Sequence, residues 1–417
     1  MKIIADLQIH SKYSRATSSQ MVIEELAKWA KLKGIKVMGT GDFTHPFWIR
    51  ELKEKLKPAE PGLFTWKDDS VSEAEATRFM LTAETSHIYT RNNQVRRIHL
   101  LIWAPSFESV EKINQQLLLR GANLSSDGRP IMGIPAKELL KIVLEVDPKA
   151  MVVPAHIWTP WFSVFGSMSG FDSLEECFED LTPYIYAIET GLSSDPAMNW
   201  RLSQLDKVAV VSNSDSHSLQ RIGREANVFD TNLSYDGIIE AVKSRDPAKF
   251  LYTIEFFPEE GKYNYDGHRS CKHSVNPSHS TSDICPVCGR KMTIGVLHRV
   301  EKLADRLAGF KPPNAILFKS LVPLDEIIAA SLGMGTNSQK VRGEYQNLIS
   351  KLGSEMAVLI EAERSDLEGA TLPEIAEGIM RVREGRVKIE PGYDGEYGKI
   401  KIFDEAETKS RAQTALF

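Results

Sequence analysis

Val210-Val211-Ser212-Asn213-Ser214-Asp215-Ser216-His217-Ser218 is the stretch on which the interpretation of this chain depends. Two apolar residues lead directly into an Asp-x-His pair, a pattern typical of a buried parallel strand that ends in a carboxylate and an imidazole. Both groups bind metal ions in proteins. The stretch therefore indicates a metal site, although a capped turn after a strand would give the same residues.

The same arrangement recurs along residues 1–250. Short apolar runs at 3–9, 37–40, 80–83, 151–155 and 185–188 each lead to polar residues of the metal-ligand type. The run at 98–103 instead begins beside His99, which fits the pattern less well. Helical stretches such as 19–33 separate the runs, and about seven strand–helix units close most economically into a barrel. We therefore expect an α/β barrel whose strand ends bring together His10, Asp42, His45, Glu84, His156, Glu189, Asp215 and His217.

The composition is that of a soluble globular protein. With 417 residues, two or three folding units are expected. Hydrophobic residues make up 42% and charged residues 26%, and no apolar run reaches membrane-spanning length. The first residues, MKIIADLQIH, have none of the features of a secretory leader. We expect a cytoplasmic protein that does not bind membranes, and its net charge of −5 gives no overall attraction to nucleic acid.

Three of the four cysteines lie close together in the sequence, and two of them form a Cys-x-x-Cys pair. In a chain without a leader this spacing favours a metal over disulfides. His273 and His279 compete with His268 for the place of a fourth ligand, and Cys177 is left as a small buried side chain. We predict one structural zinc ion with the ligands His268, Cys271, Cys285 and Cys288.

The chain divides into three predicted domains. The barrel takes residues 1–250, a zinc-binding ribbon takes 251–300, and a mainly helical domain takes 301–417 and ends in a β-hairpin over 387–402. Helices are expected at 300–307, 324–332, 341–352, 355–363 and 372–384. The ribbon is basic, so it either grips DNA phosphates without reading sequence or serves only as a clip between its neighbours. Its cations are Arg269, Lys272, Arg290, Lys291 and Arg299.

Several of these motifs resemble the polymerase-and-histidinol-phosphatase (PHP) superfamily, whose members are distorted seven-stranded barrels that usually hold three divalent ions. The superfamily's first motif, His-x-His after a strand, corresponds to Gln8-Ile9-His10 here. The other matching stretches are Gly41-Asp42-Phe43-Thr44-His45, Thr82-Ala83-Glu84, His99, His156 and Asp215-Ser216-His217.

Five further stretches resemble endonuclease Q, a family of DNA repair enzymes within that superfamily, over nearly the whole chain. The resemblance implies an endonuclease that cuts 5′ to a deaminated base (hypoxanthine, uracil or xanthine) or to an abasic site, so damaged DNA is the expected partner. A sliding clamp or another repair factor is left open as a further partner. The matching stretches are 10–18, 189–196, Asp266-Gly-His-Arg-Ser-Cys271, Cys285-Pro-Val-Cys-Gly289 and Pro391-Gly-Tyr-Asp-Gly-Glu-Tyr397.

The resemblance also implies a set of ion ligands. His10, Glu84 and Asp215 would hold one ion, and Glu84 would bridge to a second ion held by His99 and His156. His45 and His217, with Asp42, would hold a third. The residues expected to take part directly in catalysis are Glu84, His156, Asp215 and His217.

Gln8 departs from the superfamily pattern because it stands where the first histidine of His-x-His is usual. An amide oxygen is a poorer ligand than imidazole for zinc-like metals, so the site would bind one ion weakly, favour Mg²⁺ or Mn²⁺ over Zn²⁺, or be impaired. Asp6 would orient the ligands without contacting the ion. Glu189 would act either in the same way or on the substrate.

The stretch 156–171 combines aromatic residues with Gly and Ser after a strand end. Trp158, Trp161 and Phe162 could stack on a base of damaged DNA; alternatively, these rings and Phe165 pack over the mouth of the barrel. Two other functions fit the sequence. One is a small-molecule phosphoesterase on the same barrel, and the other is a DNA-binding protein whose metal site is impaired.

Overall fold

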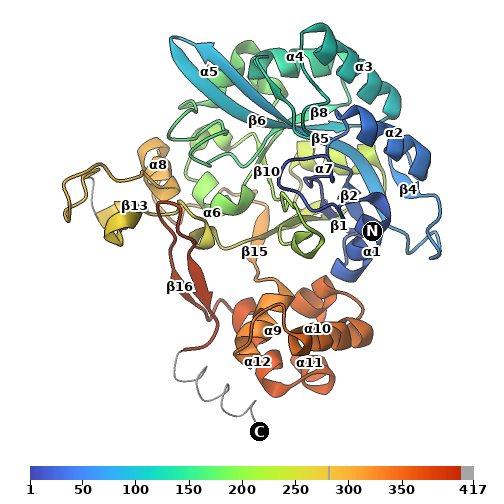
Figure 1. The fold of residues 1–417 in the computed structure, drawn as a ribbon, viewed down its shortest axis with the longest axis vertical. Helices are drawn as coiled ribbons and strands as arrows, with labels where there is room; N and C mark the ends of the chain where they lie inside the picture. Colours follow the sequence, from blue (N-terminus) through green and yellow to red (C-terminus); the bar gives the residue numbers. More distant parts are fainter. Residues whose placement is uncertain (280–281, 405–417) are drawn as a thin grey trace.

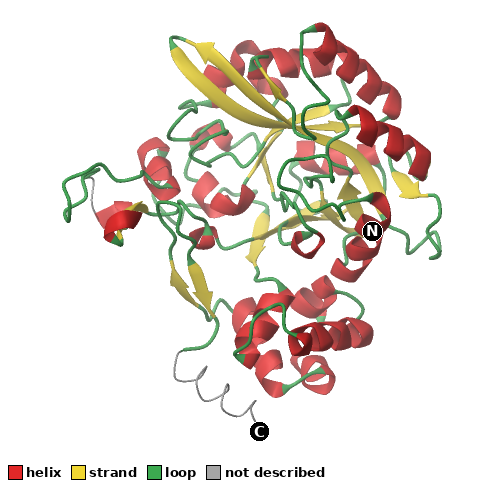
Figure 2. Ribbon diagram, in the orientation of Figure 1, coloured by secondary structure: helices red, strands yellow, loops and turns green. Residues whose placement is uncertain are grey.

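The computed structural model describes residues 1–279 and 282–404 (Figure 1). A mixed sheet surrounded by helices forms its upper part, a group of helices lies below, and a small segment extends to one side (Figures 1 and 2). No helix in these residues is both long enough and apolar enough to cross a bilayer. Predictions for residues 405–417 lie outside the described residues.

The main sheet is parallel where the chain begins. β1 (Lys2–Asp6) pairs in parallel with β2 (Val37–Gly39), and β2 pairs in parallel with β5 (Arg78–Arg91). Their apolar residues are almost completely buried, as expected for strands that are covered on both faces. The predicted runs at 3–9 and 37–40 therefore begin as strands, although β1 already ends at Asp6.

An antiparallel hairpin replaces the two short strands predicted at 80–83 and 98–103. β5 continues through Glu84 to Arg91, turns, and pairs antiparallel along its length with β6 (Gln94–Ala104). Leu101 lies directly opposite Glu84, and His99 is two residues away from Leu101. Because side chains alternate between the two faces of a strand, Glu84 and His99 point to the same face of the hairpin. The prediction that Glu84 ends its strand and His99 begins one was wrong.

Four more contacts bring the remaining predicted strands around to β1. β6 pairs antiparallel with β8 (Met151–Pro154), and β9 (Ala187–Glu189) pairs in parallel with β10 (Ala209–Val211). After β8, the backbone N–H of Ile157 donates to the carbonyl of Glu189 at 2.9 Å. After β10, Ser216 forms a parallel bridge with Ile9, beyond the end of β1. The strands that carry the predicted site residues, or lead to them, thus follow one another around a ring.

Three strands that the sequence did not predict extend the sheet on the other side of β1. β11 (Ala226–Asp230) pairs antiparallel with β1, and β12 (Phe250–Glu255) pairs antiparallel with β11. β15 (Leu317–Ser320) comes from the region predicted to be helical and pairs in parallel with β12. The shorter strands are β3 (Leu56–Pro58), β4 (Phe64–Trp66) and β7 (Ile131–Met132).

Amphipathic helices cover the sheet. In α4 (Ala136–Val146), Leu139, Leu140 and Val143 recur at helical spacing and are buried, while the lysines and glutamates of the helix face outward or lie at its edge. The other helices of this part are α1 (Ile23–Lys33), α2 (Pro46–Lys55), α3 (Phe107–Leu119), α5 (Leu174–Phe178), α6 (Pro196–Asn199) and α7 (Tyr235–Ser244).

The segment at the side of the sheet carries the clustered cysteines. It consists of the short strands β13 (Asp266–His268) and β14 (His273–Val275), followed by α8 (Val296–Leu303). The predicted C-terminal hairpin is confirmed as β16 (Lys388–Glu390) paired antiparallel with β17 (Lys399–Lys401). Its turn packs on the cysteine segment, since Asp394 accepts hydrogen bonds from the N–H of Arg269 at 2.7 Å and the hydroxyl of Thr293 at 2.5 Å.

The lower helical group docks on α1 through a buried ion pair. Lys33 Nζ lies 2.7 Å from Glu355 Oε2, and both side chains are almost fully enclosed. Gly34, in the left-handed conformation at the end of α1, lies so close to Ser354 that a Cβ would approach its Oγ to 2.6 Å. The group contains α9 (Leu324–Leu332), α10 (Gln339–Leu352), a π-helical turn (Ala357–Glu361), α11 (Arg364–Ala370), which was not predicted, and α12 (Pro373–Arg383).

Candidate metal centre

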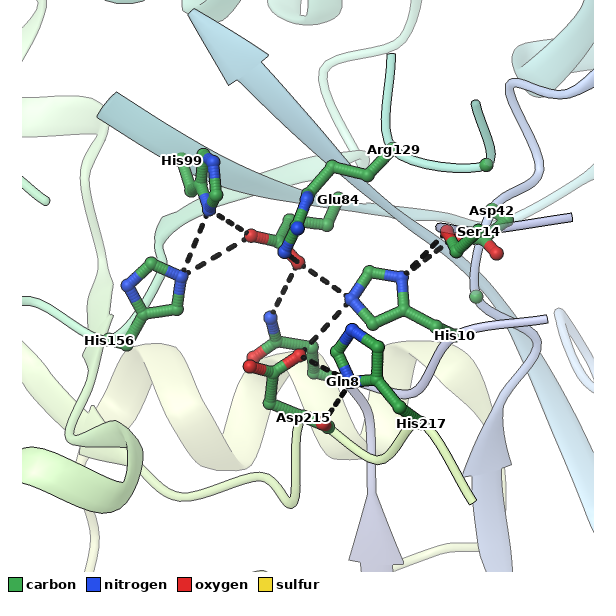
Figure 3. Close-up of polar contacts among 12 residues, drawn as sticks. Gln8, His10, Ser14, Asp42, Glu84, His99, Arg129, His156, Asp215 and His217 are labelled. Carbon is green, nitrogen blue, oxygen red and sulfur yellow. Dashed lines mark hydrogen bonds and ion pairs between the residues drawn. The ribbon is translucent and has the colours of Figure 1, made fainter. Parts of the chain in front are cut away.

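Six side chains from distant parts of the sequence form two groups of possible metal ligands (Figure 3). In each group, three donor atoms lie within 4.8 Å of one another. We call His10, Asp215 and His217 the first triad, and Glu84, His99 and His156 the second triad.

Glu84 joins the two triads. Its Oε2 lies 2.9 Å from His10 Nε2, and its Oε1 lies 2.6 Å from His99 Nδ1 and 3.3 Å from His156 Nε2. Burial alone would raise the pKa of Glu84, but the charge of Arg129 and the imidazoles around it hold that pKa well below the usual range. Glu84 is therefore a carboxylate with one oxygen directed to each triad, the arrangement of a bridging ligand.

The first triad is fixed through its backbone. His10 N donates to the carbonyl of Ser216 at 2.9 Å, and His10 Nε2 lies 3.1 Å from Asp215 Oδ1. Asp215 has a φ of 46°, a left-handed conformation that is costly for a residue with a side chain. Asp6 holds the adjoining backbone, because its carboxylate accepts from the N–H groups of Ser214 and Gly223 at 3.0 and 2.9 Å. Asp6 thus holds the backbone on both sides of Asp215 and His217, and burial raises its pKa to about 6.

The second triad depends on Glu189 in a similar way. The backbone N–H of His156 donates to Glu189 Oε2, and Asn213 Nδ2 donates to Oε1, both at 2.8 Å. Burial raises the pKa of Glu189 to about 8. Gly191 leaves room for this approach, since a Cβ there would lie 2.4 Å from His156 Cβ. Glu189 therefore positions His156 through the backbone.

Gln8 bears on whether ions fit between these residues. Its Nε2 donates to Glu84 Oε2 at 3.0 Å, while its Oε1 is buried and has no hydrogen-bond partner within the described ranges. A buried acceptor without a partner is costly, and a cation would satisfy it. The surrounding carboxylates and imidazoles are the ligands that divalent ions such as Zn²⁺ and Mn²⁺ use. The residues present therefore fit metal ions.

The third group implied by the resemblance is not assembled in the part of the chain that the structure describes. His217 lies with His10 and Asp215, and neither Asp42 nor His45 belongs to a triad. Asp42 instead lies 3.0 Å from His10 Nδ1, on the other edge of that ring, and its Oδ2 accepts from the N–H and hydroxyl of Ser11 at 2.6 and 2.7 Å. Asp42 therefore orients His10 rather than completing a ligand group with His217.

His45 lies at the edge of this arrangement. Its ring stacks on Tyr13 with 4.4 Å between centroids, and its buried Nδ1 has no hydrogen-bond partner among residues 1–279 and 282–404. Burial lowers the pKa of His45, so the neutral imidazole is favoured.

Arg129 is a residue of the site that the sequence analysis missed. Its Nη1 lies 3.3 Å from Glu84 Oε2, although it comes from the loop between α3 and β7 and follows no strand. The neighbouring Gly128 was the available signal: a Cβ there would lie 2.4 Å from Asp42 Oδ2 and 2.3 Å from Ser14 Oγ. Only a glycine allows this loop to approach the site so closely.

The aromatic stretch after β8 separates into buried and accessible rings. Trp158 is fully buried, packs on Phe165, and donates from Nε1 to Asn199 Oδ1 at 2.8 Å, so the prediction that it stacks on DNA was wrong. Trp161 and Phe162 are partly exposed. The Phe162 ring lies 4.6 Å from the His99 ring, which places it beside the second triad.

Arg299 was predicted among the phosphate-gripping cations, but it is buried in α8. Its guanidinium donates to the carbonyls of Phe165 and Phe171 at 3.0 and 2.9 Å and to Asp172 at 2.6 Å. It therefore ties the cysteine segment to the aromatic loop. Arg269, Lys272, Arg290 and Lys291 are exposed and remain available for a ligand.

The cysteine segment contains a third group of possible metal ligands. Donor atoms of His268, Cys271, Cys285 and Cys288 lie within 4.8 Å of one another, and His268 Nδ1 is 3.2 and 3.3 Å from the sulfurs of Cys271 and Cys288. Four such donors suit a tetrahedral ion. His273 and His279 do not belong to the group, and Cys177 is buried apart from it.

The fold and these sites define a mixed α/β protein with buried His/Glu/Asp groups, a separate His/Cys₃ group and a helical C-terminal region. It matches the structure of a lesion-specific endonuclease Q from Pyrococcus furiosus with a TM-score of 0.85 and 31% identity over 97% of this chain and 96% of that one. This chain belongs to the endonuclease Q family. A second endonuclease Q structure, in complex with a 27-mer duplex that has an abasic lesion at the active site, matches with the same TM-score and identity over 98% of both chains.

The chain also matches two uncharacterized proteins and one domain model. The chain is 29% identical to the uncharacterized protein YqxK of Bacillus subtilis over 96% of its own length and 99% of that protein. It is 32% identical to the uncharacterized protein MJ0043 of Methanocaldococcus jannaschii over 59% of its own length and 31% of that protein. Residues 323–386 match the model of the MJ0043 C-terminal domain, which corresponds to the lower helical group.

Proposed function

We propose that this protein is a metal-dependent DNA repair endonuclease that hydrolyses the phosphodiester 5′ to a deaminated base (hypoxanthine, uracil or xanthine) or to an abasic site. The observation that carries the proposal is the pair of triads bridged by Glu84, in a chain whose relative was crystallised with an abasic lesion at the active site. The seven strands of the ring (β1, β2, β5, β6, β8, β9 and β10) would then form the PHP barrel.

Two ions fit the bridged triads best. Asp215, His10, His217 and Glu84 Oε2 would hold one, and Glu84 Oε1, His99 and His156 would hold the other. Divalent ions there, whether Zn²⁺, Mg²⁺ or Mn²⁺, would acidify water and neutralise charge on the phosphate. Gln8 could add its amide oxygen, which favours the harder ions.

Exposure indicates the side from which DNA approaches. His10 and Glu84 are enclosed, whereas the side chains of Asp215, His217 and Arg129 are 26%, 31% and 28% exposed. A substrate phosphate would therefore meet the first triad and Arg129 before any other part of the centre. The ligand geometry would be held by residues that contact the ligands and not the ions, namely Asp6, Asp42 and Glu189. This reduces the reorganisation needed when the substrate binds.

The other domains would bind DNA around this centre. We propose a structural zinc ion on His268, Cys271, Cys285 and Cys288 in a ribbon over 251–300, with Arg269, Arg290 and Lys291 on phosphates. Trp161 and Phe162 would stack on an extruded base beside the second triad. Residues 301–417 would form the third, mainly helical domain. We also propose that the protein is cytoplasmic.

Nicking of defined duplexes tests the function. Duplexes that carry uracil, hypoxanthine, an abasic site or no lesion are incubated with the protein and Mg²⁺ or Mn²⁺, beside a generic phosphate monoester. Lesion-dependent nicking is expected, and Asp215→Asn and His217→Ala should abolish it while the circular dichroism spectrum is unchanged. Asp236→Asn is the matched control, because it removes the same charge from an exposed position in α7.

The other outcomes identify the rival functions. Release of phosphate from the monoester without nicking would replace the proposal with a small-molecule phosphoesterase. Binding of the duplex without cleavage of either substrate would indicate a DNA-binding protein whose metal site is impaired, the possibility that Gln8 raises.

A further inference from the structure

Arg129 brings a fixed positive charge to the mouth of the metal centre. It follows Gly128, whose N–H donates to the carbonyl of Tyr13 at 3.0 Å and whose carbonyl accepts from the Thr44 hydroxyl at 3.3 Å. Its own N–H donates to Asp127 Oδ1 at 3.1 Å. The backbone of this loop is therefore held against the same elements that carry His10 and Asp42, and the guanidinium is directed at the centre before any substrate arrives.

Most of the hydrogen-bonding capacity of this guanidinium is unused. An arginine side chain has five N–H donors, and Arg129 uses one of them, in a single contact of 3.3 Å from Nη1 to Glu84 Oε2. The remaining donors have no acceptor among residues 1–279 and 282–404. The contact is long and involves one oxygen, unlike the paired contacts that Arg201 makes with Glu301 at 2.7 and 2.8 Å. Arg129 is therefore not a saturated structural ion pair.

We propose that Arg129 is a catalytic residue that binds a non-bridging oxygen of the scissile phosphate. The inference rests on the proposed function, since it assigns a substrate contact within the same centre. The planar donor fork of arginine matches two oxygens of a phosphate, and the residue lies on the exposed side from which a phosphate would approach.

The charges of the centre favour this role over metal binding. A guanidinium cannot ligate a cation, and it repels ions placed beside Glu84. Negative charge on the phosphate increases as the attacking oxygen bonds to phosphorus, and a fixed cation at hydrogen-bond distance stabilises that charge without reorganisation. Arg129 therefore interacts favourably with the transition state of phosphodiester hydrolysis but makes no favourable interaction with the ions themselves.

Binding of inorganic phosphate to the Mn²⁺-loaded protein tests the contact independently of nicking. In isothermal titration calorimetry, the phosphate dissociation constant of Arg129→Gln should be about 10–100-fold larger than that of the wild type, the effect typical of losing a charged hydrogen-bond partner. Arg129→Lys should recover part of that affinity. Arg120→Gln, an exposed arginine in the segment before the same loop, should bind phosphate as the wild type does. Affinity for Mn²⁺ should not fall in any of these variants.

Nicking of a lesion duplex with a methylphosphonate at the scissile linkage tests the catalytic role. We expect Arg129→Gln to reduce kcat on the normal duplex by about 10²–10³-fold, the effect of removing one transition-state donor. On the neutral linkage, which lacks the charged oxygen, the loss should shrink to less than about tenfold. Equal losses on both linkages would overturn the proposal.

Two results separate this proposal from the proposed function. If the wild type nicks no lesion duplex, the endonuclease assignment fails, while the phosphate titration still decides the role of Arg129. If Arg129→Gln keeps its phosphate affinity but loses Mn²⁺, Arg129 only supports Glu84, and the substrate contact is refuted.

Discussion

Asp42→Asn separates a residue that orients a ligand from a residue that is a ligand. The Asp42 carboxylate is fully buried and accepts from the Ser11 N–H, the Ser11 hydroxyl and His10 Nδ1. An asparagine keeps one oxygen and replaces the other with a donor. If the NH₂ group faces Ser11, it meets another N–H donor, and a buried donor without a partner costs about 1–3 kcal/mol.

The opposite orientation of the asparagine disturbs His10 itself. With the NH₂ group facing His10, Nδ1 must accept, and the ring proton moves to Nε2. Nε2 is the atom that lies 2.9 Å from Glu84 and 3.1 Å from Asp215, so the proton would occupy the position of the ion. Either orientation should lower the affinity of the first triad for its proposed ion by about 10–100-fold without changing the number of ions bound.

Metal titration of the apoprotein measures both quantities. Calorimetry with Mn²⁺ gives the affinity, and elemental analysis of the saturated protein gives the ion count, with Asp236→Asn as the control for loss of charge. His10→Ala, which removes a member of the first triad, should lower the count by one. The reasoning is refuted if Asp42→Asn also loses one ion while the remaining ion binds as in the wild type, because Asp42 would then be a ligand.

Three further changes test the supporting structure. Cys285→Ser should lose the zinc ion proposed for the cysteine segment, measured by zinc release, and should lower the melting temperature of the protein, measured by calorimetry. Lys33→Met leaves the enclosed carboxylate of Glu355 with the hydrogen bonds from Leu324 and Tyr345 but without its cationic partner, and should cost about 3–5 kcal/mol in urea unfolding. Burial and the carboxyl group of Glu255 raise the pKa of Glu225 well above 4.5. The folded protein therefore keeps this proton at pH values where the unfolded chain has lost it, so the free energy of unfolding should fall as pH rises from 4.5 through the raised pKa. Glu225→Gln should make this fall less steep.

Each of these predictions has its own control. Cys177→Ser should leave the zinc content unchanged, since Cys177 lies outside the segment. Adding Glu355→Gln to Lys33→Met should restore part of the lost stability; a double variant no more stable than Lys33→Met would show that the uncompensated charge is not the cause. Glu145→Gln, at an exposed position in α4, should keep the wild-type pH dependence; equal flattening there would contradict the assignment to Glu225.

The sequence by itself determined the parts of this protein whose physical cause is local. Apolar runs beside acids or imidazoles located the seven strands of the ring, and spacing indicated the three clustered cysteines, with His268 preferred to His273 and His279 as the fourth ligand. Such patterns are readable because periodicity and short spacing depend on the backbone of the segment itself. Whole-chain resemblance to endonuclease Q added the family, which the comparisons confirmed.

Only the tertiary structure decided which atoms meet. The antiparallel β5–β6 hairpin places Glu84 and His99 on one face, where a parallel reading had put them at different strand ends. Asp42 lies behind His10, Arg129 reaches the centre from a loop with no strand before it, and Trp158 is enclosed in the core. The partners of each of these side chains come from segments far away in the sequence. Whether two such segments meet depends on how the sheets and loops pack, and a local sequence pattern does not contain that information.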